Sequence, residues 1–526
     1  MEHGQGEAAA TLHAILDEHG LSVEFPPPVL REVEAIQRDP GIDDPALADL
    51  THLPFVTIDY ADSRDLDQAM HLEREADGFV VRYALADAAH YVRPGSALFD
   101  EALARGVSYY LPGLTVPMLP PELSEGIVSL LPGVDRRALV FVLHLDHDGR
   151  TRRTEVVRGR IRSRAKLSYD GVQAHHDDPG SSPLAGQLQT ETLELLGQVG
   201  RLRIAEARGR DVIHFDRVET EVDLQDGGSA FCVRVERRND VSRWNEQISL
   251  LCNIEGARLL AARGGEREHV QPVYRVHEPP EPVALQRLQR MMRRMVQAHG
   301  LAPSLGDWRR DGAQARESLA DYLDRLRSSE TPRRVVDAIE RQALYTGQRS
   351  TFSAEPGRHY ALGVSPYARF SAPMREIVGV FTHKEALELL GLEPPRATDE
   401  RDERLREQVI AAANTGKERQ RRIGKRVTGA FIDQLLGGDL ELPLERRATR
   451  RGTVLGLNPS RLYVQLDDPP VEVKVYTEEL GPCRLEDEIS LVPEQGDGCR
   501  FTLGDSLALR TAGRDSRGRW RLAPLP

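Results

Sequence analysis

The 526-residue chain has little of what marks a secreted, disulfide-bonded or membrane protein. Its four cysteines are widely spaced and form no Cys-x-x-Cys pair, which argues against a disulfide framework and against a zinc site. No apolar stretch approaches the roughly 20 residues of a membrane span, and the first residues lack the basic start and apolar run of a signal peptide. We therefore expect a cytoplasmic protein with reduced thiols and no membrane contact.

Aromatic residues and net positive charge are also scarce. Phe, Trp and Tyr make up 5% of the residues, and the formal net charge is -12 at pH 7. This charge argues against a protein that coats nucleic acid through its overall charge, whereas a local basic surface is compatible with it. The densest basic run is 417–426. On a helix, such a run is either a solvated face or a surface that follows a nucleic-acid backbone.

Residues 53–72 carry the most informative pattern. An apolar run with strand composition, 55–58, ends at Asp59, and a polar turn then leads to Asp65 and Asp67. Residues i and i+2 of an extended chain point to one side, so these two carboxylates can face a point that Asp59 also reaches. Such carboxylates repel by about one to several kcal/mol per pair unless they are solvated, protonated or bound to a cation. All-oxygen ligands favour Mg²⁺ or Mn²⁺, and a solvated acidic turn is the alternative.

The sequence around these aspartates resembles the signature of the RNase II/RNase R family of exoribonucleases, whose catalytic unit is the RNB domain. The matching residues are Thr57-Ile58-Asp59 and Asp65-Leu66-Asp67. Several blocks in the family's order are far more specific than one motif. The further blocks that resemble the family are 84–92, 94–96, 110–113, 117–124, 129–136 and 370–375.

The resemblance implies a catalytic site that holds Mg²⁺, with Mn²⁺ as the alternative ion. Asp59, Asp65 and Asp67 match three of the family's acidic ligands. Gln68 stands where the motif usually has a further aspartate, and its neutral carbonyl would leave the site with one negative charge fewer. Arg375 matches the family's active-site arginine, whose guanidinium can hold the scissile phosphate.

The pattern around the arginine is only partly kept. Glu376 stands where the family usually has a basic residue, and Gly379 stands where it usually has an aspartate. His383 matches the family. These departures leave open how well the site works.

The resemblance also implies an RNA path lined by aromatic side chains. Tyr110 matches a tyrosine that stacks near the terminal nucleotide, and Phe215 would lie at the other end of the stacked bases. Stacking contributes about 1–3 kcal/mol per base and tolerates any sequence. Each aromatic residue alone would be interpreted as a core residue. The further candidate RNA contacts are Tyr169, Glu246, which would contact a ribose, and Tyr463.

The pattern predicts an α+β fold with three parts. Residues 1–50 have helical spacing and form a small helical region, helix-turn-helix-like or a spacer, where the best-known family members have cold-shock barrels. Residues 51–440 are the RNB catalytic domain, a mixed sheet packed with helices. Residues 447–526 alternate as short strands and resemble the S1-type OB barrel, a fold that binds single strands.

Together these features predict a monomeric, cytoplasmic, Mg²⁺-dependent exoribonuclease. It would degrade single-stranded RNA processively from the 3′ end to 5′-nucleoside monophosphates, a direction and product that the resemblance implies. Gln68 leaves open a catalytically weak or inactive RNA-binding regulator with the same fold. A nuclease for single-stranded DNA is a third hypothesis, because metal chemistry alone does not read the 2′-hydroxyl.

Overall fold

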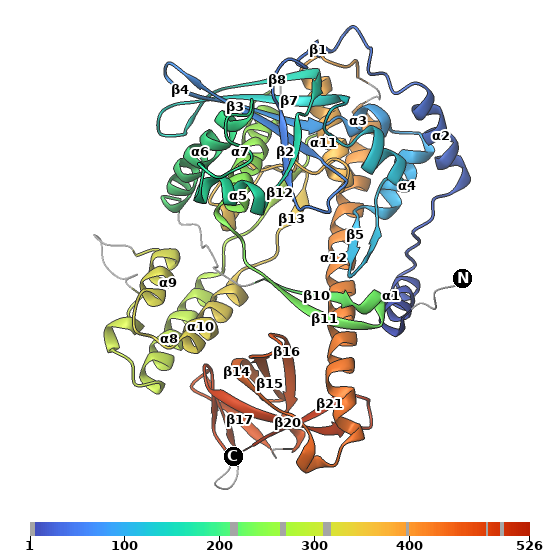
Figure 1. Ribbon diagram of the computed structural model, residues 1–526. Helices are drawn as coiled ribbons and strands as arrows, with labels where there is room; N and C mark the ends of the chain where they lie inside the picture. The colour runs from blue at the N-terminus through green and yellow to red at the C-terminus, as the bar shows by residue number, and fades with distance from the viewer. Residues whose placement is uncertain are drawn as a thin grey trace.

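The structure is a computed structural model that describes residues 6–210, 219–263, 270–308, 317–395, 399–479, 482–494 and 499–525. A mixed seven-stranded sheet with helices around it forms one end of the molecule, and a small all-β unit forms the other (Figure 1). This arrangement confirms the α+β fold class. Among the described residues, no helix is both long enough and apolar enough to cross a membrane.

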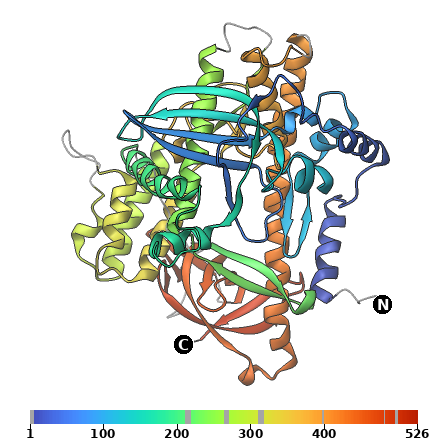
Figure 2. The ribbon, with the colours of Figure 1, turned by 45° about the horizontal axis from the view of Figure 1, so that its top comes forward.

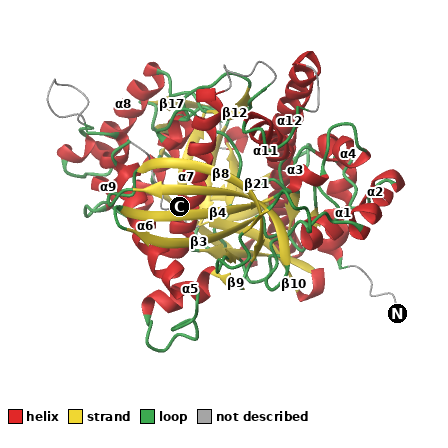
Figure 3. Cartoon of the chain, turned by 90° about the horizontal axis from the view of Figure 1, so that it is seen from above, coloured by secondary structure: helices red, strands yellow, loops and turns green. Residues whose placement is uncertain are grey.

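The main sheet has the strand order β1-β8-β7-β4-β3-β2-β9. Its neighbours pair antiparallel except β1 with β8 and β2 with β9, which pair parallel. Figure 3 shows β4 and β3 side by side from above, with β8 further along the same sheet. The central strand β4 is buried on both faces, which explains why it has few polar residues and no alternation. The bounds are β1 Ala48–Asp49, β2 Val56–Asp59, β3 Gln68–Glu75, β4 Gly78–Ala86, β7 Asp135–Leu145, β8 Thr151–Arg162 and β9 Ala165–Ser168.

Three helices enclose the core beside the main sheet: α6 (Thr190–Arg208), α7 (Asp240–Arg263) and α11 (Ile377–Leu389). Thr192 fixes α6 to β3, because its Oγ1 accepts a hydrogen bond from Leu72 N at 3.2 Å. Every residue of α11 is buried, as expected for a helix with no solvent-facing side.

The helix α12 (Asp399–Gly437) connects the two ends of the molecule (Figures 1 and 2). Its 39 residues correspond to a length of about 58 Å at 1.5 Å per residue. It packs against α11 near one end, and its later part shares an apolar core with the all-β unit.

The all-β unit combines a five-stranded sheet, order β16-β15-β14-β20-β21, with a three-stranded sheet, β17-β18-β19. It rests on α8 (Pro282–Ala298) and α10 (Arg333–Thr346). Arg290 and Arg294 of α8 pair with Glu488 at 3.3 and 3.2 Å, so this basic helix is partly neutralised inside the molecule. The strand bounds are β14 Thr449–Asn458, β15 Arg461–Leu466, β16 Glu472–Tyr476, β17 Cys483–Glu486, β18 Ser490–Pro493, β19 Phe501–Thr502, β20 Ser506–Arg514 and β21 Trp520–Pro524.

Two helices begin the described chain, as predicted, and they dock at separate places. α1 (Glu7–Glu18) packs against β11 (Ala230–Glu236) and α12, whereas α2 (Pro27–Arg38) packs against α4 (Ala97–Arg105) and the π-helix η1 (Glu122–Ile127). The helix-turn-helix role of this region stays a prediction.

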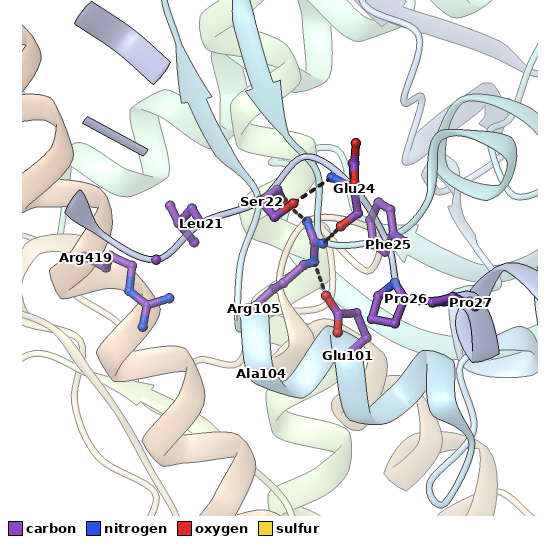
Figure 4. Close-up of a pocket in the computed structure, with 11 residues that line it drawn as sticks. Leu21, Ser22, Glu24, Phe25, Pro26, Pro27, Glu101, Ala104, Arg105 and Arg419 are labelled. Atoms are coloured by element: carbon purple, nitrogen blue, oxygen red, sulfur yellow. Dashed lines mark hydrogen bonds and ion pairs between the residues drawn. The ribbon is translucent and has the colours of Figure 1, made fainter. Parts of the chain in front are cut away.

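Arg105 of α4 fixes the linker between α1 and α2 (Figure 4). Its guanidinium donates to the carbonyl oxygens of Ser22 at 3.0 Å and Glu24 at 2.7 Å, and it lies 3.9 Å from the ring centroid of Phe25. These residues line a cavity of about 440 Å³ beside Arg419 of α12. A buried cation therefore holds the linker.

Short elements complete the fold. Two hairpins are formed by β5 with β6 and by β10 with β11, and a third pair joins β12 to the distant β13. The bounds are β5 Tyr109–Leu111, β6 Leu114–Val116, β10 Glu219–Gln225, β12 Tyr274–Val276, β13 Thr351–Ser353, α3 Ala88–Tyr91, α5 Tyr169–Asp177 and α9 Leu319–Arg327.

The contact between α6 and α7 gives a first prediction. A Cβ at Gly200 would lie 2.4 Å from the side chain of Trp244, whereas a Cβ at Gly429 of α12 would meet nothing within 4 Å. Gly200→Ala should lower the free energy of unfolding by about 1–3 kcal/mol through overpacking. Gly429→Ala should raise it by up to about 1 kcal/mol through helix propensity. Thermal unfolding measures both, and equal shifts in the melting temperature would contradict the prediction.

Candidate active site

Asp59 stands at the end of β2, where a short turn is held from two sides. Its Oδ1 accepts hydrogen bonds from Tyr60 N at 2.8 Å and from Ser63 Oγ at 3.1 Å. Lys166 of the parallel neighbour β9 donates through Nζ to Ala61 O at 2.7 Å and also to Ser63 O. The apolar run of β2 therefore delivers the carboxylate to the sheet edge, and a cation from the next strand fixes the turn that follows.

Asp67 is buried immediately before β3 and pairs with Arg375. Its Oδ1 accepts from Met374 N at 2.9 Å, and its Oδ2 pairs with Arg375 Nε at 2.5 Å. Burial raises the pKa of Asp67 to about 6, against the opposing effects of Arg375 and the Met374 N–H. Burial also lowers the pKa of Arg375, but the nearby carboxylates outweigh it and the pKa is raised. A carboxylate and a guanidinium from distant segments thus stabilise each other's charged form.

The structure brings all three predicted aspartates into electrostatic reach of Arg375. Asp65 also contacts an aromatic side chain, since its Oδ2 accepts from the Tyr110 hydroxyl at 2.9 Å. Tyr110 is 55% exposed, so its ring faces solvent beside the carboxylates. In the described part of the chain, the carboxylate oxygens of Asp59, Asp65 and Asp67 do not all approach within 4.8 Å of one another.

The donor set fits a hard divalent cation. Asp59 and Asp65 are only half-buried, and in the residues that the structure describes each keeps one carboxylate oxygen without a hydrogen bond. Asp67 adds a third carboxylate beside them. Oxygen ligands of this kind suit Mg²⁺ or Mn²⁺ and offer nothing to metals that prefer sulfur.

Gln68 forms a bridge at the start of β3. Its Oε1 accepts a hydrogen bond from the Tyr83 hydroxyl of β4, and its Nε2 donates to Ser371 O. An amide oxygen has two lone pairs, so the oxygen that Tyr83 occupies can still face a cation. The structure therefore gives Gln68 one definite role, which is to connect the sheet to the loop before Arg375.

Asn253 of α7 holds the loop from the other side. Its Oδ1 accepts from Phe370 N at 2.7 Å and from Ser371 N at 3.1 Å. Its Nδ2 donates to Ser371 Oγ at 3.0 Å and to the Tyr367 hydroxyl at 3.1 Å. A single buried amide thus accepts both backbone N–H groups of this turn, while Gln68 and His383 contact its carbonyl oxygens.

Gly379 of α11 lies directly beneath the loop. A Cβ at this position would lie 2.9 Å from Pro373 Cα and 3.0 Å from Ala372 O. No side chain fits without moving the backbone that leads to Arg375. This contact explains a glycine where the family resemblance leads us to expect an aspartate.

The remaining aromatic and acidic candidates divide between the two ends of the molecule. The Tyr169 hydroxyl accepts from Asn245 Nδ2 at 3.0 Å, and its ring meets that of Tyr60 edge-on at 5.3 Å between centroids. Burial raises the pKa of Tyr169 to about 12, and the charge of nearby Asp59 adds to the rise. Glu246 lies beside Asn245 on α7 and pairs with an arginine of the β11–α7 connection.

One predicted RNA contact, Tyr463, is not part of this centre, and the position of another, Phe215, is not described. Tyr463 lies on β15, half-buried and opposite Gly456 of β14, in the all-β unit at the other end of the molecule (Figure 1). Phe215 lies outside the described residues.

A second acidic cluster lies in the core, formed by Glu385 and Glu388 of α11 with Asp402 of α12. Lys384 occupies its middle: its Nζ lies 2.8 Å from Glu385, 3.2 Å from Glu388 and 3.1 Å from Asp402. Burial raises the pKa of Glu385 to about 7, although Lys384 opposes the rise. The protein's own ammonium group thus supplies the cation here, and the cluster joins the two helices.

Several residues that organise the centre were missed by the sequence analysis. Tyr60 follows Asp59 directly, and this position next to a predicted metal ligand could have indicated an aromatic residue of the site. Asn253 is a polar residue within the apolar run of a helix, which indicates a buried hydrogen-bonding role. Tyr83 gave no signal, because its strand composition alone indicates a core residue.

Fold and site together define an α+β protein with a carboxylate and arginine centre on its main sheet and a separate all-β unit. Residues 47–385 match the family model described as the RNB domain. The chain therefore belongs to the RNB family, as its sequence blocks predicted.

Relatives agree with this assignment. Ribonuclease R of Vibrio parahaemolyticus is 30% identical over 386 residues, which cover 72% of this chain and 44% of that protein. Exoribonuclease 2 of Edwardsiella piscicida is 29% identical over 484 residues, covering 88% of this chain and 68% of the relative. The chain spans about half the length of the ribonuclease R relatives it matches.

A solved structure matches the fold over nearly the whole chain. Mycoplasma genitalium RNase R, in complex with ribose methylated single-stranded RNA, superposes with a TM-score of 0.84. The match covers 98% of this chain and 77% of that chain at 21% sequence identity. At this identity, the likeness shows a shared fold.

The Asn253 contacts give a second prediction. Asn253→Ala removes the acceptor of two buried N–H groups, and each unsatisfied group should cost about 1–3 kcal/mol. Asn458→Ala is the matched control, because its Oδ1 serves the solvent-accessible turn at Ser460. Thermal unfolding should show a large loss for the first variant and a small one for the second. Equal losses would mean that Asn253 does not hold the loop.

Proposed function

We propose that this protein is a divalent-cation-dependent exoribonuclease that hydrolyses single-stranded RNA from the 3′ end and releases 5′-monophosphates. The observation that carries the proposal is the pair of buried Asp67 with partly exposed Arg375, with Asp59 and Asp65 in electrostatic reach of the same guanidinium. Carboxylates that can bind a cation thus surround a guanidinium that can bind a phosphate. The 3′-to-5′ direction and the product follow from membership of the RNB family.

Each charged residue has a role in this proposal. Asp59, Asp65 and Asp67, with the neutral Gln68, would hold Mg²⁺, with Mn²⁺ as the alternative. When bound, the cation supplies an activated water and offsets the charge of the phosphodiester. Arg375 uses Nε for Asp67, and no described residue pairs with its terminal nitrogens. These two nitrogens remain available for the scissile phosphate, to which a guanidinium can donate in parallel.

Aromatic side chains would position the strand. The Tyr110 ring is exposed while its hydroxyl is fixed on Asp65, so it offers a rigid face for the terminal base. Tyr169 and Glu246 lie along α5 and α7, where a ribose could be contacted. The all-β unit, residues 447–526, would hold the incoming strand with Tyr463. We extend the proposal to processive degradation by a cytoplasmic monomer.

Gln68 favours one other function, an RNA-binding regulator without useful turnover. A neutral ligand weakens the hold on a divalent cation, and the Gln68 amide is already engaged by Tyr83 and Ser371. The two functions differ in one measurable property, which is whether RNA is shortened.

A digest of 5′-labelled single-stranded RNA and DNA tests the proposal directly. With Mg²⁺ we expect stepwise shortening of RNA from the 3′ end, and with EDTA we expect none. Shortening of DNA at the same rate would indicate the single-stranded DNA nuclease. Binding without shortening of either polymer would indicate the regulator and would overturn the proposed activity.

Asp67→Asn gives a third prediction. The amide keeps the shape of the side chain and the acceptor for Met374 N but removes the charge shared by Arg375 and the cation. We expect RNA hydrolysis to fall by at least about a thousandfold, or about 4 kcal/mol at 1.4 kcal/mol per tenfold, while RNA binding in EDTA persists. Asp62→Asn in the same turn is the control, because Asp62 is exposed. Retained turnover in Asp67→Asn would remove this carboxylate from the mechanism.

Gln68 gives a fourth prediction. Gln68→Asp adds a carboxylate to the site, and Gln68→Asn is a control of the same size without the charge. We expect Asp to lower the Mg²⁺ concentration that gives half-maximal hydrolysis, and Asn to leave it unchanged or raise it. The Mg²⁺-dependent shift in melting temperature without RNA should change in the same direction. Identical Mg²⁺ dependence in the two variants would place residue 68 outside the set of ligands.

A further inference from the structure

The carboxylate that follows Arg375 in sequence is surrounded by positive charge. Glu376 is buried, and its Oε1 accepts from Lys417 Nζ at 3.0 Å and pairs with Arg369 Nε at 3.4 Å. Arg275 is held by Ser350 Oγ at 3.0 Å and lies in electrostatic reach of the same carboxylate. Arg421 of α12 is exposed and lies in electrostatic reach of Arg275. We call these four cations the cation cluster: Arg275, Arg369, Lys417 and Arg421.

Glu376 alone does not balance the cation cluster. Burial raises the pKa of Glu376, and the surrounding cations outweigh it and lower the pKa to about 2, so the carboxylate is ionised. Even so, the pKa of Lys417 is lowered, first by burial and then by repulsion from the neighbouring arginines. Burial and the same kind of repulsion lower the pKa of Arg275. Glu376 thus faces three cations, and the fourth, Arg421, is in electrostatic reach of Glu418, so four cations face two carboxylates and a further anion would relieve the repulsion.

The excess charge is partly exposed and adjoins the candidate active site. The side chains of Arg375, Arg369 and Lys417 are 34%, 31% and 25% exposed. Arg375 lies close enough to Arg369 for its charge to act on the pKa of that residue. Helix α12 also contacts the strand segment before Tyr110, because Gln420 Nε2 donates to Ser108 O at 2.6 Å. The cation cluster therefore adjoins Arg375, and the helix that carries two of its members also contacts the segment before the exposed Tyr110.

We propose that the cation cluster binds a second backbone phosphate of the single strand, on the 5′ side of the phosphate held by Arg375. This proposal rests on the proposed function, because it extends the same RNA path. A phosphodiester fits the cluster since it is a permanent anion with two free oxygens, and guanidinium groups donate to such oxygens in pairs. Glu376 positions two of the cations by pairing with Lys417 and Arg369.

A purely structural role for these charges predicts a different outcome at Arg421. The pairs of Glu376 with Lys417 and Arg369 would then serve only to fill the core. Arg421 is exposed, and no carboxylate in the described ranges forms an ion pair with it. Its removal should leave the fold unchanged, so any effect on RNA reports the binding site itself.

The test measures the salt dependence of RNA binding in EDTA, where hydrolysis is prevented. Each lost phosphate contact should reduce the slope of log K against log salt concentration by about 0.7 for a single strand. We expect this reduction for Arg421→Gln at an unchanged melting temperature. Arg422→Gln is the control. It removes the same charge at the next residue, but the Arg422 side chain already pairs with Glu418. Lys417→Gln should lose a similar slope, and Lys417→Arg should restore it.

Replacing one phosphodiester of the RNA at a time by a neutral linkage shows which phosphate the cation cluster binds. Oligonucleotides that each carry one methylphosphonate should bind the wild-type protein less tightly at one position, and Arg421→Gln should show no further loss at that position. Wild-type slopes in Arg421→Gln and Lys417→Gln would overturn the second phosphate site, while RNA shortening by the wild type would leave the proposed function standing. A wild-type protein that binds no single-stranded RNA would overturn both.

Discussion

The ion pair between Asp67 and Arg375 joins segments 308 residues apart in the chain, and the rest of the site depends on it. Withdrawing two charges from water is costly, and the loss of either partner leaves an uncompensated buried charge. The pair therefore requires both backbones to be fixed in advance. The sheet fixes Asp67 through the start of β3, while Asn253 and the close approach of Gly379 fix the loop that carries Arg375.

Internal pairing determines which of the many arginines can act on a ligand. Arg158 of β8 is buried against Asp87, Arg162 pairs with Asp135, and the arginines of α8 contact Glu488. Each of these groups looks like a basic surface in the sequence. Near Glu376, close to Arg375, cations still outnumber carboxylates after pairing. A protein with a net charge of -12 can present a local cationic surface in this way.

The sequence predicts elements better than it predicts contacts. The apolar run before Asp59 is the strand β2, the helical spacing before residue 50 is two helices, and the alternation after residue 447 is an all-β unit. Periodicity shows which face of α1 is apolar, but it does not reveal that the partners are β11 and α12. The bridge from Gln68 to Tyr83 and Ser371 was also unpredictable, because it depends on the register of two strands and on a loop 303 residues away.

The departures from the family pattern are easier to understand together than singly. Read alone, Glu376 places a negative charge where the resemblance predicts a positive one, and Gly379 removes a carboxylate. In the folded chain Lys417 and Arg369 neutralise Glu376. The absence of a side chain at residue 379 allows the loop before Arg375 to pack directly on α11. The local charge remains positive, and Arg375 still reaches Asp67. Because compensation comes from α12, far along the chain, a missing motif residue is weak grounds for inferring a missing activity.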